Sequence, residues 1–401
     1  MTPFHRLLAA SAVSNFGDGL RLTALPLLAA SLTRDPTAVA ALTALNSLPW
    51  AIFGLVGGAI VDRVHRVRLL VAVQLLRLVI IGALAALVWT NNASLLLVYV
   101  VAFAIGTGEL LADTTMQTIL PTVVPRDRLE SANGRLYATH TITNDFVGPP
   151  VGSVLFAAVN AAPFAVNALT WGAGALLLTG LAGAQAAAGR ARASVRQDVP
   201  AGARYLFGHP MLRVLLVWSV FVNAALTAFG SIYVLYALEV LRVDEAAYGV
   251  LAAAAGAGGA TGTLLAGRLV RLIGRSRVVQ AGSVTAGAAG VAAGLVDSAV
   301  VVGGLMFLLT AAAGAVVIVL TSLRQTIVPG PMLGRVIATT RAFGYGAIPL
   351  GALLGGWLAA QFGLSAPFIV GGSVVIIAGL AIRRWVSPRA IEAARAAAGE
   401  G

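Results

Sequence analysis

Apolar runs of about 20 residues recur along the whole chain, and short polar segments separate them. An α-helix of that length crosses the roughly 30 Å of hydrocarbon in a bilayer. We therefore expect an all-α membrane protein of the multi-pass type. The pattern predicts twelve transmembrane helices, at about 7–32, 38–61, 69–90, 94–119, 132–158, 163–184, 211–240, 246–267, 277–297, 299–323, 337–361 and 365–385.

The predicted helices form two groups of six, and part of the first group's sequence returns in the second. The segment Gln-Thr-Ile-Leu-Pro at 117–121 returns as Gln-Thr-Ile-Val-Pro at 325–329, which is 208 positions later. Such an offset is typical of two parallel structural repeats. We expect an N-terminal half at 1–184, a cytoplasmic linker at 185–210, a C-terminal half at 211–385 and a short cytoplasmic tail at 386–401.

All 27 basic residues are arginines, and their positions indicate the orientation of the chain. With a cytoplasmic N-terminus, 23 of them fall in inner loops and tails, Arg324 and Arg341 among them. Two fall in outer loops, and two lie within predicted helices. This asymmetry predicts a cell-membrane protein with both termini in the cytoplasm. The net charge of +12 marks the cytoplasmic face, so we expect no nucleic-acid partner.

The composition narrows the class of function. Hydrophobic residues make up 59% of the chain and charged residues only 10%, which excludes a water-soluble globule. Cysteine and lysine are absent, which excludes disulfides, cysteine-ligated metals and the Walker A lysine of an ATPase. The 4 histidines are far apart, and no HExxH or GxSxG motif occurs. We expect a protein that is not an enzyme, holds no cofactor or metal, and draws energy from a gradient.

The loop after the second predicted helix combines a glycine, a carboxylate and three arginines at fixed spacing. It resembles the G-x-x-x-D-R-x-G-R-R/K loop of the major facilitator superfamily, with His65 in place of the usual glycine and Val67 in place of a basic residue. That family uses the loop to latch its two halves, so the resemblance implies a gating role. A basic loop that only sets topology is the alternative. The residues of this gating loop are Gly58, Asp62, Arg63, Arg66 and Arg68.

A second motif, Gly-Pro-Pro-Val-Gly-Ser, lies in the fifth predicted helix. Proline removes a backbone donor and bends a helix, while glycines let a neighbouring helix come close. Through Gly148, Pro149 and Gly152 the motif resembles the G-P-x-x-G-G element of antiporters in the same superfamily, with Ser153 in place of the last glycine. The resemblance implies antiport, and a bend that serves packing alone is the alternative.

Together with the helix count and the repeat, these motifs make almost the whole chain similar to a major facilitator transporter. The Gly17-Asp18 pair, Arg77 and the stretch 205–213 look most like the efflux branch that contains macrolide and enterobactin exporters. The fourth helix departs from the wider antiporter pattern because it has no arginine. Any role of that arginine passes to Arg77 or is missing.

Charged residues occur at a common depth in four predicted helices, roughly 14–18 Å from the cytoplasmic ends. They are Asp18, Arg77, Glu109 and Asp145. Charges at that depth are costly and act as ion-pair partners or proton sites. Asp145 has no cation within one turn of its own helix, so we expect it to carry the proton, with Glu109 as the next candidate. We expect Asp18 to pair with Arg21 or Arg77, and static neutralising pairs are the alternative.

Two further residues, Asp113 and His140, complete this group. Four carboxylates against two arginines leave a surplus of negative charge, which favours proton handling over static pairing. His140 lies one turn before Asn144 and could relay protons between the cytosol and Asp145. A structural, hydrogen-bonded histidine is the alternative.

Glycines at i and i+4 occur in the pairs 54/58, 258/262 and 351/355. Small residues at this spacing lie on one face of a helix and predict close contacts with a neighbouring helix.

The second half carries amide and aromatic residues where the first half carries charges. An apolar, aromatic wall suits an amphipathic solute, and ordinary packing is the alternative. The expected cavity residues are Asn15 from the first half and Asn223, Phe229, Tyr233, Tyr236, Phe343 and Tyr345 from the second.

The sequence thus predicts a secondary active transporter that exports amphipathic small molecules of drug, macrolide or siderophore type, in exchange for protons and by alternating access. Its expected partners are the small-molecule substrate, protons and the lipid bilayer, and we expect a monomer. The first alternative is an importer or uncoupled facilitator of the same fold. A lipid scramblase or a membrane-embedded enzyme is the alternative from another class.

Overall fold

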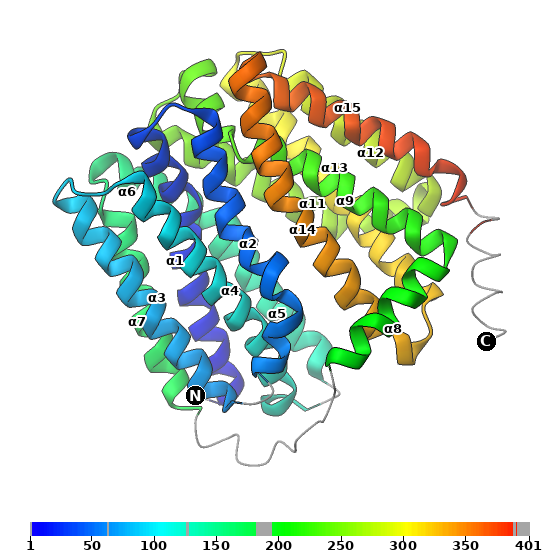
Figure 1. Cartoon of the computed structure of the whole chain (residues 1–401), viewed down its shortest axis with the longest axis horizontal. Helices are drawn as coiled ribbons and strands as arrows, with labels where there is room; N and C mark the ends of the chain where they lie inside the picture. Colours follow the sequence, from blue (N-terminus) through cyan, green and yellow to red (C-terminus); the bar gives the residue numbers. More distant parts are fainter. Residues whose placement is uncertain (1, 62–63, 126–127, 182–194, 388–389, 391–401) are drawn as a thin grey trace. The chain divides into compact units, whose positions relative to one another are not determined.

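The computed structural model describes residues 2–61, 64–125, 128–181, 195–387 and 390, and every regular element in these ranges is helical (Figure 1). The elements η2 and η3 are π-helices, and η4 is a 3-10 helix. In chain order the elements are α1 (Pro3–Leu32), α2 (Pro36–Val61), α3 (Arg66–Trp89), α4 (Leu95–Val123), α5 (Leu129–His140), η2 (Thr141–Val147), α6 (Gly148–Ala158), α7 (Ala162–Thr179), α8 (Val195–Gly208), α9 (Pro210–Gly230), α10 (Tyr233–Leu235), η3 (Tyr236–Val240), α11 (Glu245–Ile273), α12 (Arg275–Ala293), α13 (Ala299–Ile327), α14 (Gly330–Phe362), α15 (Ala366–Ala381) and η4 (Ile382–Arg384).

Within these described ranges, 9 helices are long and apolar enough to cross a membrane. They coincide with nine of the predicted spans. The other three predicted spans also coincide with helical segments, namely α1, α5 to α6, and α12. Of these, α1 contains Asn15, Asp18 and Arg21, alanine and glycine make up much of α12, and α5 and α6 are only 12 and 11 residues long. The all-helical fold class is confirmed, and the count of twelve crossings stays a prediction.

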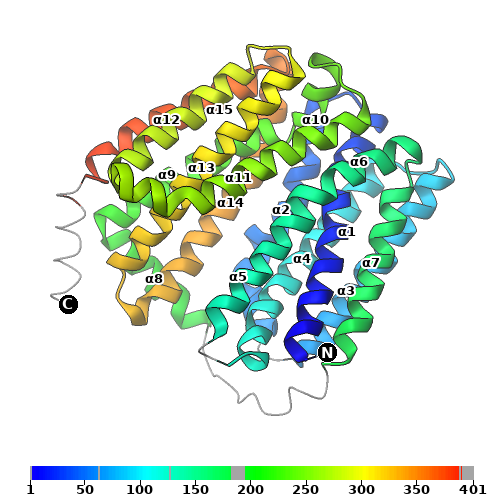
Figure 2. The same cartoon turned by 180° about the vertical axis from the view of Figure 1, so that it is seen from behind.

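The chain forms two compact units, and unit 1 comprises Met1–Arg34, Leu45–Ala193 and Val243–Ala253. In this unit α1 packs against α6 and α7, and α3 packs against α4 and α7. The views from opposite sides show α1, α3 and α7 running side by side (Figures 1 and 2).

A hydrophobic cluster of unit 1 joins four helices near the start of α1. Leu7 of α1, Leu70 of α3, Ile119 of α4 and Leu178 of α7 are at most 1% exposed and belong to this cluster. Burial of apolar side chains of this size stabilises each contact by roughly 1.5–3 kcal/mol. The cluster therefore fixes the three helices, α1, α3 and α4, that carry most of the internal charges.

Unit 2 comprises Asp35–Ala44, Ser194–Arg242 and Ala254–Gly401. In this unit α12 packs against α13 and α15, and α9 packs against α14 and α15. The shorter helix α8 packs against α14. These helices surround the cavity described below.

Glycines set the closest helix contacts of unit 2. A Cβ atom at Gly258 or Gly262 of α11 would collide with the backbone of α13, and one at Gly351 or Gly355 of α14 would collide with the backbone of α9. Two of the three predicted glycine contacts are therefore confirmed. The prediction is wrong for Gly54 of α2, which faces open space.

Candidate functional site

The charged side chains of α1, α3 and α4 form one network inside unit 1. Arg77 Nη2 donates a hydrogen bond to Asp18 Oδ1 at 2.9 Å, and Arg21 Nη2 donates one to Glu109 Oε1. Two longer ion pairs link these couples, Arg77 to Glu109 at 3.6 Å and Arg21 to Asp18 at 3.9 Å. The residues Arg21 and Arg77 are only 5% and 3% exposed. Two buried guanidiniums thus face two carboxylates, which balances the charge of the network.

Arg77 is also held by a neighbour on α7. Its guanidinium carbon lies 4.0 Å from the ring centroid of Trp171, a cation–π contact. One turn earlier on α3, Gln74 Nε2 donates to Ser14 Oγ of α1 at 2.8 Å. These contacts fix the guanidinium in one position, as a charge-balancing group requires.

Asp113 and Asp145 lie outside this network. Asp113 follows Glu109 by one turn on α4, and among the described residues no arginine lies within ion-pair distance of either aspartate. Asp145 Oδ1 accepts a hydrogen bond from Asn144 Nδ2 at 2.7 Å, and its Oδ2 lies 3.7 Å from His140 Nδ1. The Asp145 side chain is 34% exposed, so protein atoms do not enclose it.

Asp145 lies on the π-helix η2, directly before the predicted bend motif. The backbone N–H of Gly148 bonds to the carbonyl oxygen of Thr143, which closes the wider turn of a π-helix. Pro149 follows and has no N–H to donate to the residue four positions earlier, Asp145. The structure thus changes helix type at the position where the sequence predicts a bend. Single π-helical turns of this kind occur frequently at functional sites.

The glycines of the motif bring α6 onto α1. A Cβ atom at Gly148 would lie 2.7 Å from the carbonyl carbon of Gly19, and one at Gly152 would lie 2.7 Å from Cα of Leu20. Thr23 Oγ1 of α1 donates to the carbonyl oxygen of Pro149 at 3.0 Å. The motif therefore joins the helix of Asp145 to the helix of Asp18 and Arg21.

Replacing Gly152 by alanine should lower the free energy of unfolding by about 1–3 kcal/mol, because the new methyl group overlaps the backbone of α1. Thermal unfolding of the detergent-purified protein measures the effect. The matched control is Gly134→Ala on α5, where nothing lies within 4 Å of the added Cβ and the helix should gain up to about 1 kcal/mol. An unchanged unfolding temperature for Gly152→Ala would show that α6 does not need this close approach.

The gating loop lies partly outside the described residues, namely at Asp62 and Arg63. Gly58 belongs to α2, but its surroundings are also outside the described part. Beyond it, Arg66 is the first residue of α3. His65, which replaces the usual glycine, caps this helix by accepting the backbone N–H of Arg68 with its ring nitrogen at 3.5 Å. The histidine at position 65, where the family pattern has glycine, therefore has a local structural role.

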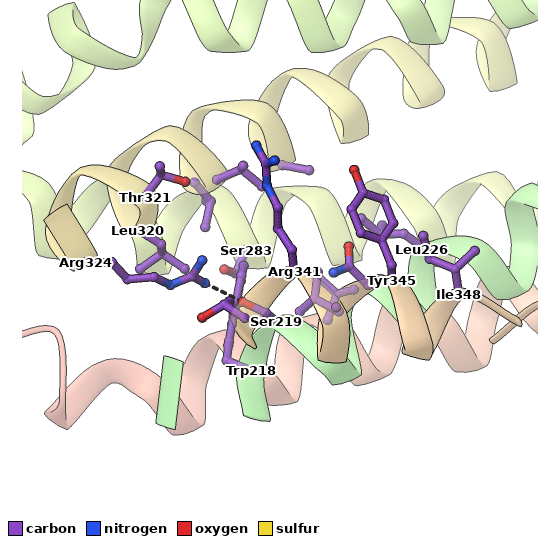
Figure 3. A pocket seen from close by; sticks show the side chains of 18 of the residues that line it. Trp218, Ser219, Leu226, Ser283, Leu320, Thr321, Arg324, Arg341, Tyr345 and Ile348 are labelled. Carbon is purple, nitrogen blue, oxygen red and sulfur yellow. Dashed lines mark hydrogen bonds between the residues drawn. The ribbon is translucent and has the colours of Figure 1, made fainter. Parts of the chain in front are cut away.

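Unit 2 contains a cavity of about 450 Å³ lined by α9, α12, α13, α14 and one residue of α15 (Figure 3). Its volume lies in the range of small-molecule sites. Two of the expected cavity residues, Asn223 and Tyr345, line it. Arg324 and Arg341 also line it, and Arg324 Nη2 donates to Ser219 Oγ at 2.6 Å.

Three other aromatic residues expected at a cavity form a cluster elsewhere in unit 2. Phe229, Tyr233 and Tyr236 surround Phe368, with ring centroids 5.2, 6.2 and 4.4 Å away. All three are buried, and none of them lines the cavity of Figure 3. In the structure they pack α9, α10 and η3 against α15.

The remaining two expected cavity residues also lie away from it. Phe343 is exposed and packs edge to face against Phe207 of α8, with ring centroids 5.8 Å apart. Asn15 belongs to unit 1, where its Nδ2 donates to Ser11 Oγ at 3.0 Å.

The sequence did not indicate that two arginines line a cavity, because their positions also fit the cytoplasmic basic residues. In the structure Arg324 lies in the last turn of α13, and Arg341 lies three turns inside α14. The predicted span 337–361 already contained Arg341, which was the signal available in the sequence. For Arg324 the signal was its position next to the repeated Gln-Thr-Ile segment.

Solved transporters share this fold. A bacterial homologue of the iron transporter ferroportin in an inward-facing state superposes with a TM-score of 0.78 at 15% identity, over 96% of this chain and 98% of that chain. The nucleoside transporter NupG gives a TM-score of 0.73 at 14% identity, over 96% and 99%. The fold is that of a membrane transporter.

The chain belongs to the transmembrane secretion effector family of major facilitator transporters, which matches residues 1–399. The multidrug efflux pump Tap of Mycolicibacterium fortuitum is 23% identical over 92% of this chain and 91% of its own length. The uncharacterized MFS-type transporter y4rN of Sinorhizobium fredii is 26% identical over 94% and 93%. The resemblance to the drug efflux branch is thereby confirmed.

Proposed function

We propose that this protein exports amphipathic small molecules from the cell in exchange for protons, by alternating access of two six-helix halves. The observation that carries the proposal is the charge arrangement of unit 1. Asp18 and Glu109 neutralise both buried arginines, so the carboxylates of Asp113 and Asp145 remain for another task. Surplus carboxylates at membrane depth are typical of proton pathways. The efflux activity in the name of Tap supports the outward direction.

We assign the proton to Asp145. Its carboxylate is about one-third exposed and contacts a histidine and an amide rather than a guanidinium. A carboxylate without a permanent cation changes its protonation state more easily than one fixed by an arginine. His140, within ion-pair distance, is the relay group of this proposal. Asp113, the other carboxylate without an arginine partner among the described residues, is the next candidate for the proton, ahead of Glu109, which is paired with Arg21.

The test is transport by the purified protein in proteoliposomes with an acidic lumen. Ethidium and fluorescein serve as probes of different charge and shape. We expect at least one of them to accumulate in the lumen about ten-fold per exchanged proton for each unit of pH difference, since one unit corresponds to 1.36 kcal/mol. A protonophore should abolish the accumulation. Flux of the probes that never exceeds equilibration would favour an uncoupled facilitator instead.

The same proposal includes twelve membrane crossings, a monomer and both termini in the cytoplasm of the cell. Because the chain contains no cysteine, single cysteines can be placed without background labelling. Cysteine at Ala93, between α3 and α4, should react with an impermeant maleimide added to intact cells. Cysteine at the exposed His5 should react only after the membrane is opened. The opposite labelling would reverse the orientation.

A further inference from the structure

The cavity of unit 2 is positively charged, and none of the described residues that line it supplies a negative charge. Arg324 and Arg341 reach it from different helices, α13 and α14, as Figure 3 shows. None of the described lining residues is acidic, and the hydrogen-bond partner of Arg324 is the neutral Ser219. In unit 1, by contrast, the two buried guanidiniums of Arg21 and Arg77 each contact a carboxylate.

Two buried polar groups of the cavity wall also lack a partner within the described part of the chain. They are the indole nitrogen of Trp218 and the hydroxyl of Ser283, whose residues are 7% and 1% exposed. A buried donor without an acceptor is costly, but both atoms are closed off from the cavity space, so the two arginines and not these groups define the anion site.

The rest of the wall is apolar. Leu226, Val316, Leu320 and Ile348 line it together with further aliphatic residues. A ligand that matches both parts has an oxyanion at the arginine end and a hydrophobic body along the aliphatic wall.

From this we infer that the cavity binds amphipathic anions, so that the substrates of this transporter are lipophilic acids with a carboxylate or phosphate group. The inference rests on the proposed function, of which it specifies the substrate class. Arg324 and Arg341 bind the oxyanion.

Two dyes with the same xanthene ring system test the inference. Fluorescein carries a carboxylate and is an anion, whereas rhodamine 123 is a methyl ester and a cation. Binding to the purified full-length protein in detergent is measured by fluorescence anisotropy, at a pH where fluorescein is ionised. We expect fluorescein to bind at least about ten-fold more tightly than rhodamine 123. Equal binding, tighter binding of the cation, or binding of neither dye would overturn the inference.

Substitutions of the two cavity arginines test whether their charge binds the anion. Arg324→Gln and Arg341→Gln should each raise the Kd for fluorescein about ten-fold or more, because each removes a charge-assisted hydrogen bond. The matched control is Arg213→Gln, an exposed position on α9 that does not line the cavity, and it should leave the Kd unchanged. The two variants lie on different helices, so that one remains informative when the other does not fold. An unchanged Kd in a folded cavity variant would overturn the inference.

Two further measurements are needed. One distinguishes a lipid headgroup from a small acid as the source of the anion, and the other distinguishes the anion site from the proposed antiport. Displacement of fluorescein by phosphatidylglycerol in mixed micelles, but not by a neutral phospholipid, would keep the anion site and assign it to a lipid headgroup. Displacement by dodecanoate without any effect of phosphatidylglycerol would assign it to small lipophilic acids. Binding in detergent needs no gradient, so selective binding of fluorescein without proton-driven transport would reject the proposed antiport and leave the anion site intact.

Discussion

Replacing Asp145 by asparagine is expected to abolish uphill transport while downhill flux continues. Asparagine has the shape of aspartate and keeps a hydrogen-bonding oxygen, but it cannot bind and release a proton. In the structure the Asp145 carboxylate has a hydrogen bond from Asn144 and an ion-pair contact with the exposed His140, and among the described residues no arginine pairs with it, so no buried cation loses its counterion. The accumulation ratio of a transported probe should fall from about ten-fold per pH unit to about one.

The control for this prediction is Asp297→Asn. Asp297 is exposed in the segment between α12 and α13, so the variant also removes one carboxylate but leaves unit 1 untouched. It should accumulate the probe as the parent does. If Asp145→Asn retained full pH-driven accumulation, the proton assignment would move to Asp113 and then to Glu109, and Asp113→Asn and Glu109→Gln would be measured in the same way.

Replacing Asp18 by asparagine should instead destabilise the folded protein. Asp18 Oδ1 accepts the hydrogen bond of Arg77 at 2.9 Å and lies 3.9 Å from Arg21. Its loss leaves the network with one uncompensated buried guanidinium, which costs about 3–5 kcal/mol. We expect a lower yield of monodisperse protein and a lower temperature of thermal unfolding.

A charge-balanced double variant is the control. Asp18→Asn combined with Arg77→Gln removes one charge of each sign, so part of the lost stability should return. If the double variant were destabilised by the sum of its single effects, Asp18 and Arg77 would not act as a pair, and the network would have no role in charge balance.

The sequence predicts the helical elements of this fold well because the bilayer imposes a simple length and hydropathy rule. Every predicted span coincides with a helix, including α1 despite Asp18 and Arg21. The π-helical turn η2 could not be predicted, because apolar patterning does not record the backbone hydrogen bonds that proline removes. The interpretation of Gly54 as a contact glycine failed because spacing identifies a helix face but not its neighbour.

For the charged site, depth along each helix indicated which residues lie at one level. The pairing within that level, Arg77 with Asp18 and Arg21 with Glu109, depends on how the helices are rotated and packed. The contact of Arg77 with Trp171 had no sequence signal, because tryptophan is common in apolar helices. These are properties of tertiary packing and need coordinates.

The cavity was the least predictable part. The aromatic residues expected to line it include Tyr236, which packs against Phe368 in a buried cluster. The polar groups that do line it include Arg324, which the positive-inside rule assigned to the cytoplasmic side. The positive-inside rule explains the distribution of the basic residues as a group. It therefore does not identify a single arginine that lines a cavity.

The central claim, exchange of substrate for protons, is tested most directly by the pH of the proteoliposome lumen. The dye pyranine is trapped inside, the lumen is made acidic, and the membrane potential is clamped with valinomycin and potassium. Addition of a transported probe to the outside should raise the luminal pH, because protons leave as the probe enters, and Asp145→Asn should show no change. Probe entry without a pH change in the parental protein, or with acidification of the lumen, would contradict the account.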